Sequence, residues 1–202
     1  MIRLAGILAL PALLAVPSAF ATQQARCDQP FNASFRSGSD LDLDIRSGDI
    51  EIAGFDEQEI QVTCEVRGDQ GSTRDITVRF DDKGKVGRLE VSGGPKSDVR
   101  IRIRVPRQSN LVVRCPAGDL DVIGVRGHKD VSLRAGDLTI DIGNPAEYSL
   151  AEASVKAGDL HASAFGVHKG GLFRSFRHDN PSGKYRLRAS LWAGDIKLNV
   201  AR

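Results

Sequence analysis

Five copies of a Gly-Asp pair, each followed by alternating apolar and polar residues, constrain the fold of this chain more than any other feature. Repetition of one short phrase is typical of repeat architectures, in which one structural unit is copied along the chain. Glycine adopts a positive φ without steric penalty, and an Asp side chain can accept a nearby backbone N–H, so each pair predicts a turn. The predicted structural turns are Gly48, Asp49, Gly118, Asp119, Gly136, Asp137, Gly158, Asp159, Gly194 and Asp195.

Nearly every segment after residue 38 alternates between apolar and polar residues, as in 41–45, 60–66 and 99–105. A period of two indicates strands with one face on a core and the other in water. Beyond residue 21, no window keeps an apolar period of 3.6 residues over three helical turns. The sequence therefore predicts one all-β domain over residues 38–202.

The spacing of the Gly-Asp pairs predicts how the strands are arranged. The pairs at Gly118, Gly136 and Gly158 follow one another at steps of 18 and 22 residues. Such steps predict a β-solenoid, or β-helix, with coils of about 18–22 residues. Stacked coils bring equivalent residues about 4.8 Å apart, so the Asp carboxylates must point outward or accept hydrogen bonds. An antiparallel β-sandwich is the alternative, although its hairpins favour Asp-Gly or Asn-Gly turns.

The first 21 residues have the pattern of a secretory signal peptide. Arg3 precedes an apolar run of thirteen residues, 4–16, and the small residues Ala19 and Ala21 mark a cleavage site. The run is shorter than the roughly 20 residues that a membrane span needs. We therefore expect a periplasmic or secreted bacterial protein without a transmembrane segment after cleavage, in which residues 22–37 form an N-terminal extension or cap.

The charge balance excludes some partners and raises one hypothesis. The chain has 28 Lys and Arg residues against 26 Asp and Glu residues, so its net charge of +2 does not favour nucleic acid. The distribution is uneven, because the charged residues in 37–61 are mostly acidic and those in 166–191 are mostly basic. A homo-oligomer is thus one hypothesis, with the acidic early part of one molecule meeting the basic late part of another.

Three cysteines, Cys27, Cys64 and Cys115, remain after removal of the signal peptide. Thiols pair in the oxidising compartment that an exported chain enters. We expect a disulfide between Cys27 and Cys64, which would tie the N-terminal segment to an early strand, although the sequence alone leaves the connectivity open. No CxxC or HxxxH spacing supports a metal site.

Two stretches carry a resemblance to a known family. Residues 47–55, and residues 183–189 together with 192–196, resemble the adhesin-like β-strand-repeat family of the bacterial envelope, whose members are largely uncharacterised. The resemblance covers most of residues 38–202. It implies a β-solenoid fold, an envelope location and no enzymatic activity.

Residue patterns for catalysis are absent from the sequence. There is no GxSxG elbow, SxxK motif, P-loop or GxGxxG. Four histidines, His128, His161, His168 and His178, are interpreted as exposed strand or turn residues. A polysaccharide-active enzyme would need a pair of carboxylates, but the repeated turns already explain an Asp in every coil. The sequence therefore predicts no catalytic residue, no cofactor and no metal.

Charged strand faces have a simpler explanation than a binding site. Asp40, Asp42 and Asp44 lie on one face of a strand and are interpreted as a solvated acidic face rather than as a Ca²⁺ site, which needs six to eight oxygens. Arg100, Arg102 and Arg104 alternate in the same way, and we expect them to pair with acidic residues on a neighbouring strand.

A basic and aromatic stretch, 170–188, interrupts the repeat and is the candidate binding surface. Arginine forks suit phosphate or carboxylate groups, and aromatic rings suit apolar or sugar faces. The competing interpretation is a cap that covers the open edge of the last coil. The predicted contact residues are Phe173, Arg174, Phe176, Arg177, Tyr185, Arg186 and Arg188.

Three functional hypotheses follow from these features. The first is a non-enzymatic, adhesin-like binding or structural module of the cell envelope, whose partner is an anionic glycan or other envelope polymer, a lipid headgroup, or another envelope protein. The second is a head-to-tail self-assembling scaffold, and the third a polysaccharide-active β-helix enzyme. A scaffold of this kind does not by itself distinguish among them.

Overall fold

The computed structural model describes residues 22–67, 71–95 and 98–200, and the predicted signal peptide lies outside them. Within these ranges the chain forms seventeen strands and three short 3-10 helices, η1 (Thr73–Asp75), η2 (Pro145–Glu147) and η3 (Ser163–Phe165). The predicted all-β class is therefore confirmed. Over the same ranges, no helix has the length and apolar character needed to cross a membrane.

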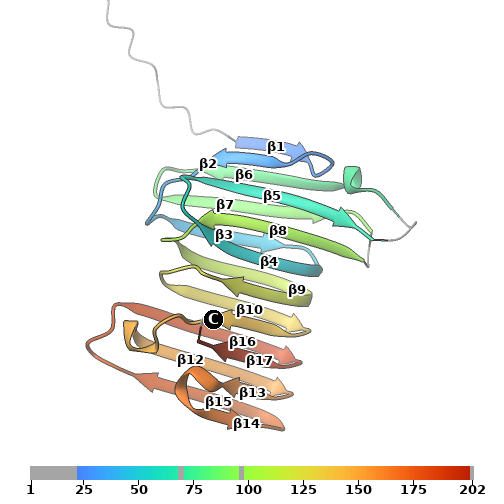
Figure 1. The fold of residues 1–202 in the computed structure, drawn as a ribbon. Helices are drawn as coiled ribbons and strands as arrows, with labels where there is room; N and C mark the ends of the chain where they lie inside the picture. The colour runs from blue at the N-terminus through green and yellow to red at the C-terminus, as the bar shows by residue number, and fades with distance from the viewer. Residues whose placement is uncertain (1–21, 68–70, 96–97, 201–202) are drawn as a thin grey trace, which may run out of the picture.

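The strands pair into two ladders that share the long strand β9 (Asn110–Ile123). The first ladder runs β1 (Thr22–Arg26), β6 (Ile76–Asp82), β7 (Val86–Gly93), β3 (Asp40–Ile45), the first half of β9, β10 (Lys129–Ala135), β16 (Tyr185–Ala193), β12 (Tyr148–Ala157), β15 (Leu172–Asp179). The second runs β2 (Phe31–Ser34), β5 (Glu59–Val66), β8 (Val99–Pro106), β4 (Gly48–Phe55), the second half of β9, β11 (Leu138–Asp141), β17 (Ile196–Asn199), β13 (Leu160–Ala162), β14 (Val167–Lys169). Figure 1 shows the strands stacked between β1 at one end and β14 at the other.

Pairing is parallel in the centre of the stack and antiparallel at its two ends. In the centre, β3, β9, β10, β16 and β12 run parallel in the first ladder, as do β4, β9, β11, β17 and β13 in the second. The pairs β1–β6 and β2–β5 at one end, and β12–β15 and β13–β14 at the other, are antiparallel. The N-terminal residues 22–37 therefore supply β1 and β2, which lie at one end of the stack.

The order of the strands in the stack differs from their order in the sequence. Strands β16 and β17 lie between β10–β11 and β12–β13, although they follow all four in the chain. Consecutive Gly-Asp corners are consequently 18 residues apart at only one step, from Asp119 to Asp137; the next two steps are 58 and 36 residues. The prediction that coils of 18–22 residues stack in sequence order is wrong beyond that single step.

The corner glycines form a column in which each packs against the carbonyl of its neighbour. A Cβ on Gly118 would lie 1.9 Å from the carbonyl oxygen of Gly48, and one on Gly136 would lie 2.0 Å from that of Gly118. The same close approach continues from Gly136 to Gly194 and from Gly194 to Gly158. A positive φ and this contact together require glycine at the corners.

The corner aspartates are linked in a second column, by hydrogen bonds from main chain to side chain. The amide N–H of Asp137 donates to Oδ1 of Asp119 at 3.2 Å, and that of Asp195 donates to Oδ1 of Asp137 at 3.2 Å. The amide N–H of Asp159 donates to Oδ1 of Asp195 at 2.9 Å. Each of these bonds offsets the repulsion expected between stacked carboxylates, so the expectation that they accept hydrogen bonds is confirmed.

The residue after each Gly-Asp pair points into the core. Ile50, Leu120, Leu138, Ile196 and Leu160 are all fully buried, and they belong to one hydrophobic cluster formed by both ladders. Burial of such a side chain contributes about 1.5–3 kcal/mol relative to leaving it exposed. The alternation seen in the sequence therefore sets which face of each strand meets the core.

Two of the three cysteines form the predicted disulfide. Cys27 and Cys64 are bonded, with their Cα atoms 5.7 Å apart, so the bond connects the segment after β1 to β5. Cys115 is free and buried on β9. Desolvation by burial raises the pKa of its thiol to about 11.

The acidic early segment lies inside the stack rather than at its end. Strands β3 and β4, which carry most of these carboxylates, each have neighbours on both sides. Their acids pair laterally with arginines on adjacent strands, as the sequence predicted: Asp49 with Arg100 at 2.8 Å and Glu51 with Arg102 at 3.8 Å. The acidic segment is therefore not an end surface that could meet a basic one head to tail.

Candidate functional site

The seven predicted contact residues lie on two strands that flank β12. Phe173, Arg174, Phe176 and Arg177 belong to β15, and the other three belong to β16. Both strands pair with β12, from opposite sides. The stretch therefore does not form one compact coil, and its residues differ in what they contact.

One predicted contact residue faces the core. Phe176 is only 8% exposed and its ring centroid lies 5.0 Å from that of Phe165. Strand alternation explains this, because the residues on either side, Ser175 and Arg177, are exposed. Phe176 therefore supports the edge of the sheet and does not belong to a contact surface.

Arg177 and Arg188 converge on one carboxylate of the strand between them. Arg177 donates to Oε1 of Glu152, and Nη2 of Arg188 lies 3.4 Å from Oε2 of the same side chain. Arg177 also pairs with Asp179 at 2.8 Å, and this hydrogen bond raises the pKa of the guanidinium and lowers that of the carboxyl. Because these groups are exposed, the pairs add little stability.

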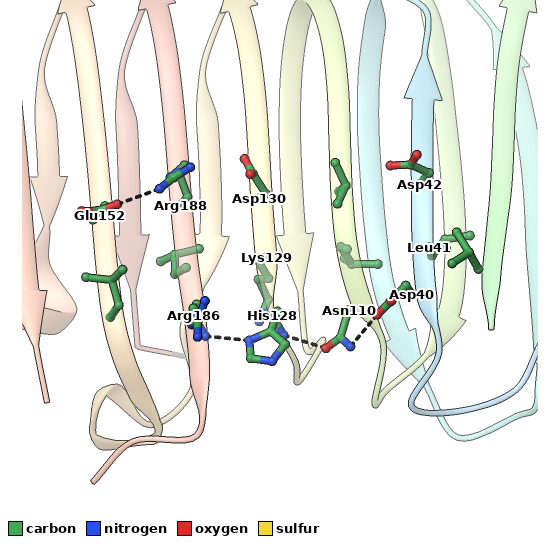
Figure 2. Close-up of a pocket in the computed structure, with 15 residues that line it drawn as sticks. Asp40, Leu41, Asp42, Asn110, His128, Lys129, Asp130, Glu152, Arg186 and Arg188 are labelled. Atoms are coloured by element: carbon green, nitrogen blue, oxygen red, sulfur yellow. Dashed lines mark hydrogen bonds and ion pairs between the residues drawn. The ribbon is translucent and has the colours of Figure 1, made fainter. Parts of the chain in front are cut away.

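Tyr185 and Arg186 join a chain of polar contacts that runs along the N-terminal ends of neighbouring parallel strands in the first ladder. The Tyr185 ring lies 6.1 Å from the ring of His128. The backbone N–H of Arg186 donates to Nδ1 of His128 at 3.0 Å, and the backbone N–H of His128 donates to the side chain of Asn110 at 2.9 Å. Asn110 in turn donates to Asp40 at 2.8 Å. Figure 2 shows this chain running across β16, β9 and β3.

A groove of about 670 Å³ lies beside these strand ends, on the outer side of the first ladder. Asp40, Asp42 and Asp130 line it from β3 and β10, and Arg186 and Arg188 line it from β16. Its charge therefore changes from acidic to basic along its length. The acidic half was missed in the sequence, because its residues come from strands far apart in the chain.

Lys129 is buried beneath this groove. It is 2% exposed, and its Nζ donates to the hydroxyl of Tyr148 at 2.8 Å and to the carbonyl of Gly127 at 3.4 Å. Desolvation lowers the pKa of the ammonium to about 8, and it raises the pKa of the Tyr148 hydroxyl above its usual value. The sequence analysis missed this pair, because Lys129 occupies a core position at which the neighbouring strands have Leu111 and Leu187.

A row of four serines crosses the outer side of the same ladder. Ser132 on β10 is paired with Ser190 on β16, Ser190 with Ser154 on β12, and Ser154 with Ser175 on β15. All four side chains point away from the core, because the residues flanking them along each strand include buried ones. Only the strand register brings these serines together.

Basic and aromatic residues flank the serine row. Two residues beyond Ser190 lies Trp192, which is 60% exposed, and the Nζ of Lys156 lies 3.5 Å from its ring centroid. Arg188 lies two residues before Ser190 on the same strand, and Arg114 is paired with Ser132. We call the serine row with Arg114, Lys156, Arg177, Arg188 and Trp192 the serine face.

Phe173 and Arg174 lie at the edge of the serine face, where β15 is irregular. Phe173 is 78% exposed and has a φ of 53°, which a residue other than glycine rarely adopts. Arg174 is anchored by its Nε, which donates to the carbonyl of Gly170 at 2.6 Å. Phe173 is thus an exposed aromatic side chain on an edge strand.

A metal site with three or more protein ligands is absent from the described residues. Within 22–67, 71–95 and 98–200, no group of three or more His, Cys, Asp or Glu side chains could hold a metal ion. The acidic face at Asp40 and Asp42 instead bonds to Asn110 and to Arg114, the latter at 3.3 Å.

Comparison with known proteins supports the fold. No family model matches the sequence, and no curated protein matches it. A putative cell adhesion protein from Clostridium sporogenes ATCC 15579 has a similar structure, with a TM-score of 0.51 at 13% identity over 84% of this chain and 98% of that one. A putative adhesin from Bacteroides fragilis NCTC 9343 matches with a TM-score of 0.24 at 9% identity, over 88% and 97% of the two chains, and this score is too low for an argument.

Proposed function

We propose that this chain is a non-enzymatic, adhesin-like binding module of the bacterial envelope, built as a β-solenoid, whose serine face holds an anionic glycan. The in-register columns of Gly-Asp corners and the parallel pairing in the centre of the stack support the solenoid. The disulfide between Cys27 and Cys64 supports an extracellular or envelope location. The likeness to the cell adhesion protein of Clostridium sporogenes supports the fold on which the module rests.

The observation that carries the ligand is the serine row between basic side chains. Equivalent residues on neighbouring strands lie about 4.8 Å apart, so the four hydroxyls form a line of hydrogen-bonding groups. Arg177 and Arg188 bind the carboxylate of Glu152, and Arg177 also pairs with Asp179, so these exposed ion pairs lie beside the row, where an anionic ligand can compete for the guanidiniums. Arg114, which pairs with Asp42, and Lys156, which lies over the ring of Trp192, are two further cations there. A chain of sugars that carries carboxylates matches hydroxyls and cations arranged in this way.

An exposed aromatic ring beside the row favours a glycan over a lipid headgroup. Trp192 presents its ring beside Lys156, and such a ring packs well against the apolar face of a sugar. A lipid headgroup would contact only the cations and would form no hydrogen bonds with the serine row. The serine row also extends across four neighbouring strands, as binding to a polymer requires.

The proposal can be tested by retention of the folded chain, residues 22–202, on immobilised polygalacturonate. The test variant is Lys156→Gln, Arg188→Gln and Trp192→Ala together, which removes two charges and one ring from the serine face. We expect retention of the wild type that weakens as salt rises and at least tenfold weaker binding by the variant. The control variant removes two charges and one exposed apolar side chain elsewhere, with Arg67→Gln, Arg102→Gln and Ile123→Ala on or next to strands of the second ladder, and should bind like the wild type.

Two further matrices separate the alternatives. Neutral dextran tests the need for negative charge, and vesicles of phosphatidylglycerol test a lipid headgroup. Equal binding of the two triple variants to polygalacturonate would show that the serine face is not the contact surface. Retention on vesicles but not on polygalacturonate would replace the glycan with a lipid surface.

A further inference from the structure

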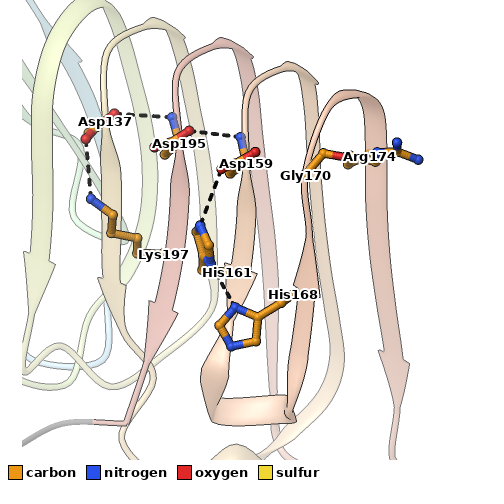
Figure 3. A network of polar contacts seen from close by, with 8 residues as sticks. All are labelled: Asp137, Asp159, His161, His168, Gly170, Arg174, Asp195 and Lys197. Atoms are coloured by element: carbon orange, nitrogen blue, oxygen red, sulfur yellow. Dashed lines mark hydrogen bonds and ion pairs between the residues drawn. The ribbon is translucent and has the colours of Figure 1, made fainter.

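Two histidines face each other across the last pair of strands in the second ladder. His161 on β13 and His168 on β14 are direct cross-strand partners. Their Nδ1 atoms are 2.8 Å apart, and their ring planes meet at 70°. Figure 3 shows both rings on the outer side of the sheet, beside the column of corner aspartates. The sequence suggested only two unconnected exposed residues.

The separation of the two Nδ1 atoms is close to that required of two ligands on one metal ion. An imidazole nitrogen binds Zn²⁺ at about 2.0–2.1 Å. Two such ligands at an angle of about 90–109° place their nitrogens about 2.9–3.4 Å apart. In the structure the two Nδ1 atoms are within hydrogen-bond distance of each other, so an ion would replace this contact: the nitrogens separate by a few tenths of an ångström, and the rings turn until both Nδ1 lone pairs are directed at the ion. The short strands and the turn at η3 already fix their relative position.

Asp159 is placed to orient one of these ligands from behind. Its Oδ2 lies 3.8 Å from Nε2 of His161, the ring nitrogen that faces away from His168. A metal-bound histidine commonly donates its other N–H to a carboxylate, which fixes the tautomer and strengthens the ligand. The backbone N–H of Asp159 donates in turn a hydrogen bond to Oδ1 of Asp195, and a Cβ at Gly170 would lie 2.8 Å from Oδ1 of Asp159.

Charge and access around the pair also suit a cation. The carboxylates of Asp137, Asp195 and Asp159 follow one another in the adjacent column. Lys197 is the cross-strand neighbour of His161 on β17, and its ammonium is directed to Oδ2 of Asp137 at 3.4 Å. The His161 side chain is 38% exposed, so an ion can reach it from solvent. Two protein ligands leave further coordination positions for water or for a group on another molecule.

We propose that His161 and His168 chelate one divalent transition-metal ion through their Nδ1 atoms, with Asp159 as the carboxylate partner of Nε2 of His161. Imidazole ligands suit Zn²⁺, Ni²⁺ and Cu²⁺ and bind Mg²⁺ and Ca²⁺ poorly. In this series Cu²⁺ binds most tightly. This site lies on the second ladder and is independent of the serine face.

Isothermal titration calorimetry, with Ni²⁺ or Zn²⁺ added to the tag-free chain of residues 22–202, tests the proposal by measuring the number of sites and their affinity. We expect one site per chain in the wild type and loss of that site in His161→Gln and in His168→Gln. Asp159→Asn should retain the site with affinity reduced about tenfold or more. His178→Gln, which alters a histidine outside the pair, is the matched control and should bind like the wild type.

A spectroscopic measurement keeps the test independent of how well each variant folds. With one equivalent of Cu²⁺, the electron paramagnetic resonance spectrum of the wild type should show two equatorial nitrogen ligands from imidazole. Binding that survives in both histidine variants, or a spectrum with fewer than two imidazole nitrogens, would overturn the proposal. Mg²⁺ should produce no heat at the same concentrations.

Discussion

The backbone amide of Asp159 donates a hydrogen bond to the carboxylate of Asp195 at 2.9 Å, although 36 residues separate the two in the chain. Both residues occupy the same position in neighbouring Gly-Asp corners. Bonds of this kind give Asp119, Asp137 and Asp195 a role beyond their own turns, because each accepts the backbone N–H of the next corner in the stack.

Substitution of Asp195 separates its role as an acceptor from its charge. Asp195→Ala leaves the part-buried N–H of Asp159 without this acceptor, and we expect a loss of about 1–2 kcal/mol in the free energy of unfolding. Asp195→Asn keeps a side-chain oxygen in place and should lose less than about 0.5 kcal/mol. Urea denaturation measures both; equal losses would mean that the charge, not the acceptor, matters.

Gly136→Ala should destabilise the protein strongly. Its φ is +122°, and the new Cβ would lie 2.0 Å from the carbonyl oxygen of Gly118. We expect a loss of about 3 kcal/mol or more. Gly143→Ala is the matched control, because Gly143 also has a positive φ, +70°, but nothing lies within 4 Å of its Cβ position. It should cost about 1–2 kcal/mol, and thermal unfolding that ranks the two in the opposite order would contradict the role of the column.

Lys129 should make the stability of the protein rise with pH above about 8. The pKa of its ammonium is about 8 in the folded state, against an ordinary value of 10.5, so between these pH values the unfolded chain binds more protons than the folded one. Deprotonation therefore favours the folded state in this window. Between pH 7 and pH 9.5 the gain is about 2 kcal/mol.

Lys129→Met provides the comparison, since it keeps an unbranched side chain and removes the ammonium. The wild type should gain about 2 kcal/mol relative to this variant between the two pH values. The raised pKa of Tyr148 keeps its hydroxyl protonated in the folded state over this range. Urea denaturation curves that shift equally in both proteins would place the titration elsewhere.

Cys115 should not react with thiol reagents while the protein is folded. Its side chain is buried, and its pKa of about 11 leaves little thiolate at pH 8. In denaturant without reductant, one thiol per chain should react, because Cys27 and Cys64 remain bonded. Rapid reaction of the native protein with a maleimide, or three reactive thiols after unfolding, would contradict this expectation.

The sequence predicted the local structure well because alternation and turn chemistry act within a few residues. Ile50 and Leu138 are buried as their pattern requires, and their Gly-Asp neighbours form the corners. Which corners become neighbours was not predictable in the same way. The sequences around Gly136, Gly158 and Gly194 are nearly identical. Each of these corners therefore presents the same backbone groups to the corner that stacks on it, and the local sequence does not determine which two become neighbours.

The candidate site shows the same division. Arg177 and Arg188 were found from their charge, and the structure brings them to one carboxylate on β12. The prediction that Phe176 is a contact residue was wrong, because it was inferred from proximity in the sequence and ignored strand alternation, which buries this side chain. The serines at 132, 154, 175 and 190 are unremarkable one by one, and only pairing between distant strands aligns them.

The position of β16 and β17 in the middle of the stack affects the timing of assembly. Strands β12 to β15 are made before β16 and β17, yet in the described structure β12 and β13 pair with the rest of the two ladders through these later strands. While the chain is being synthesised, β12 to β15 have no partner on the growing stack. The native ladders can form completely only after residue 199 has been synthesised, so the chain stays incompletely folded throughout its synthesis.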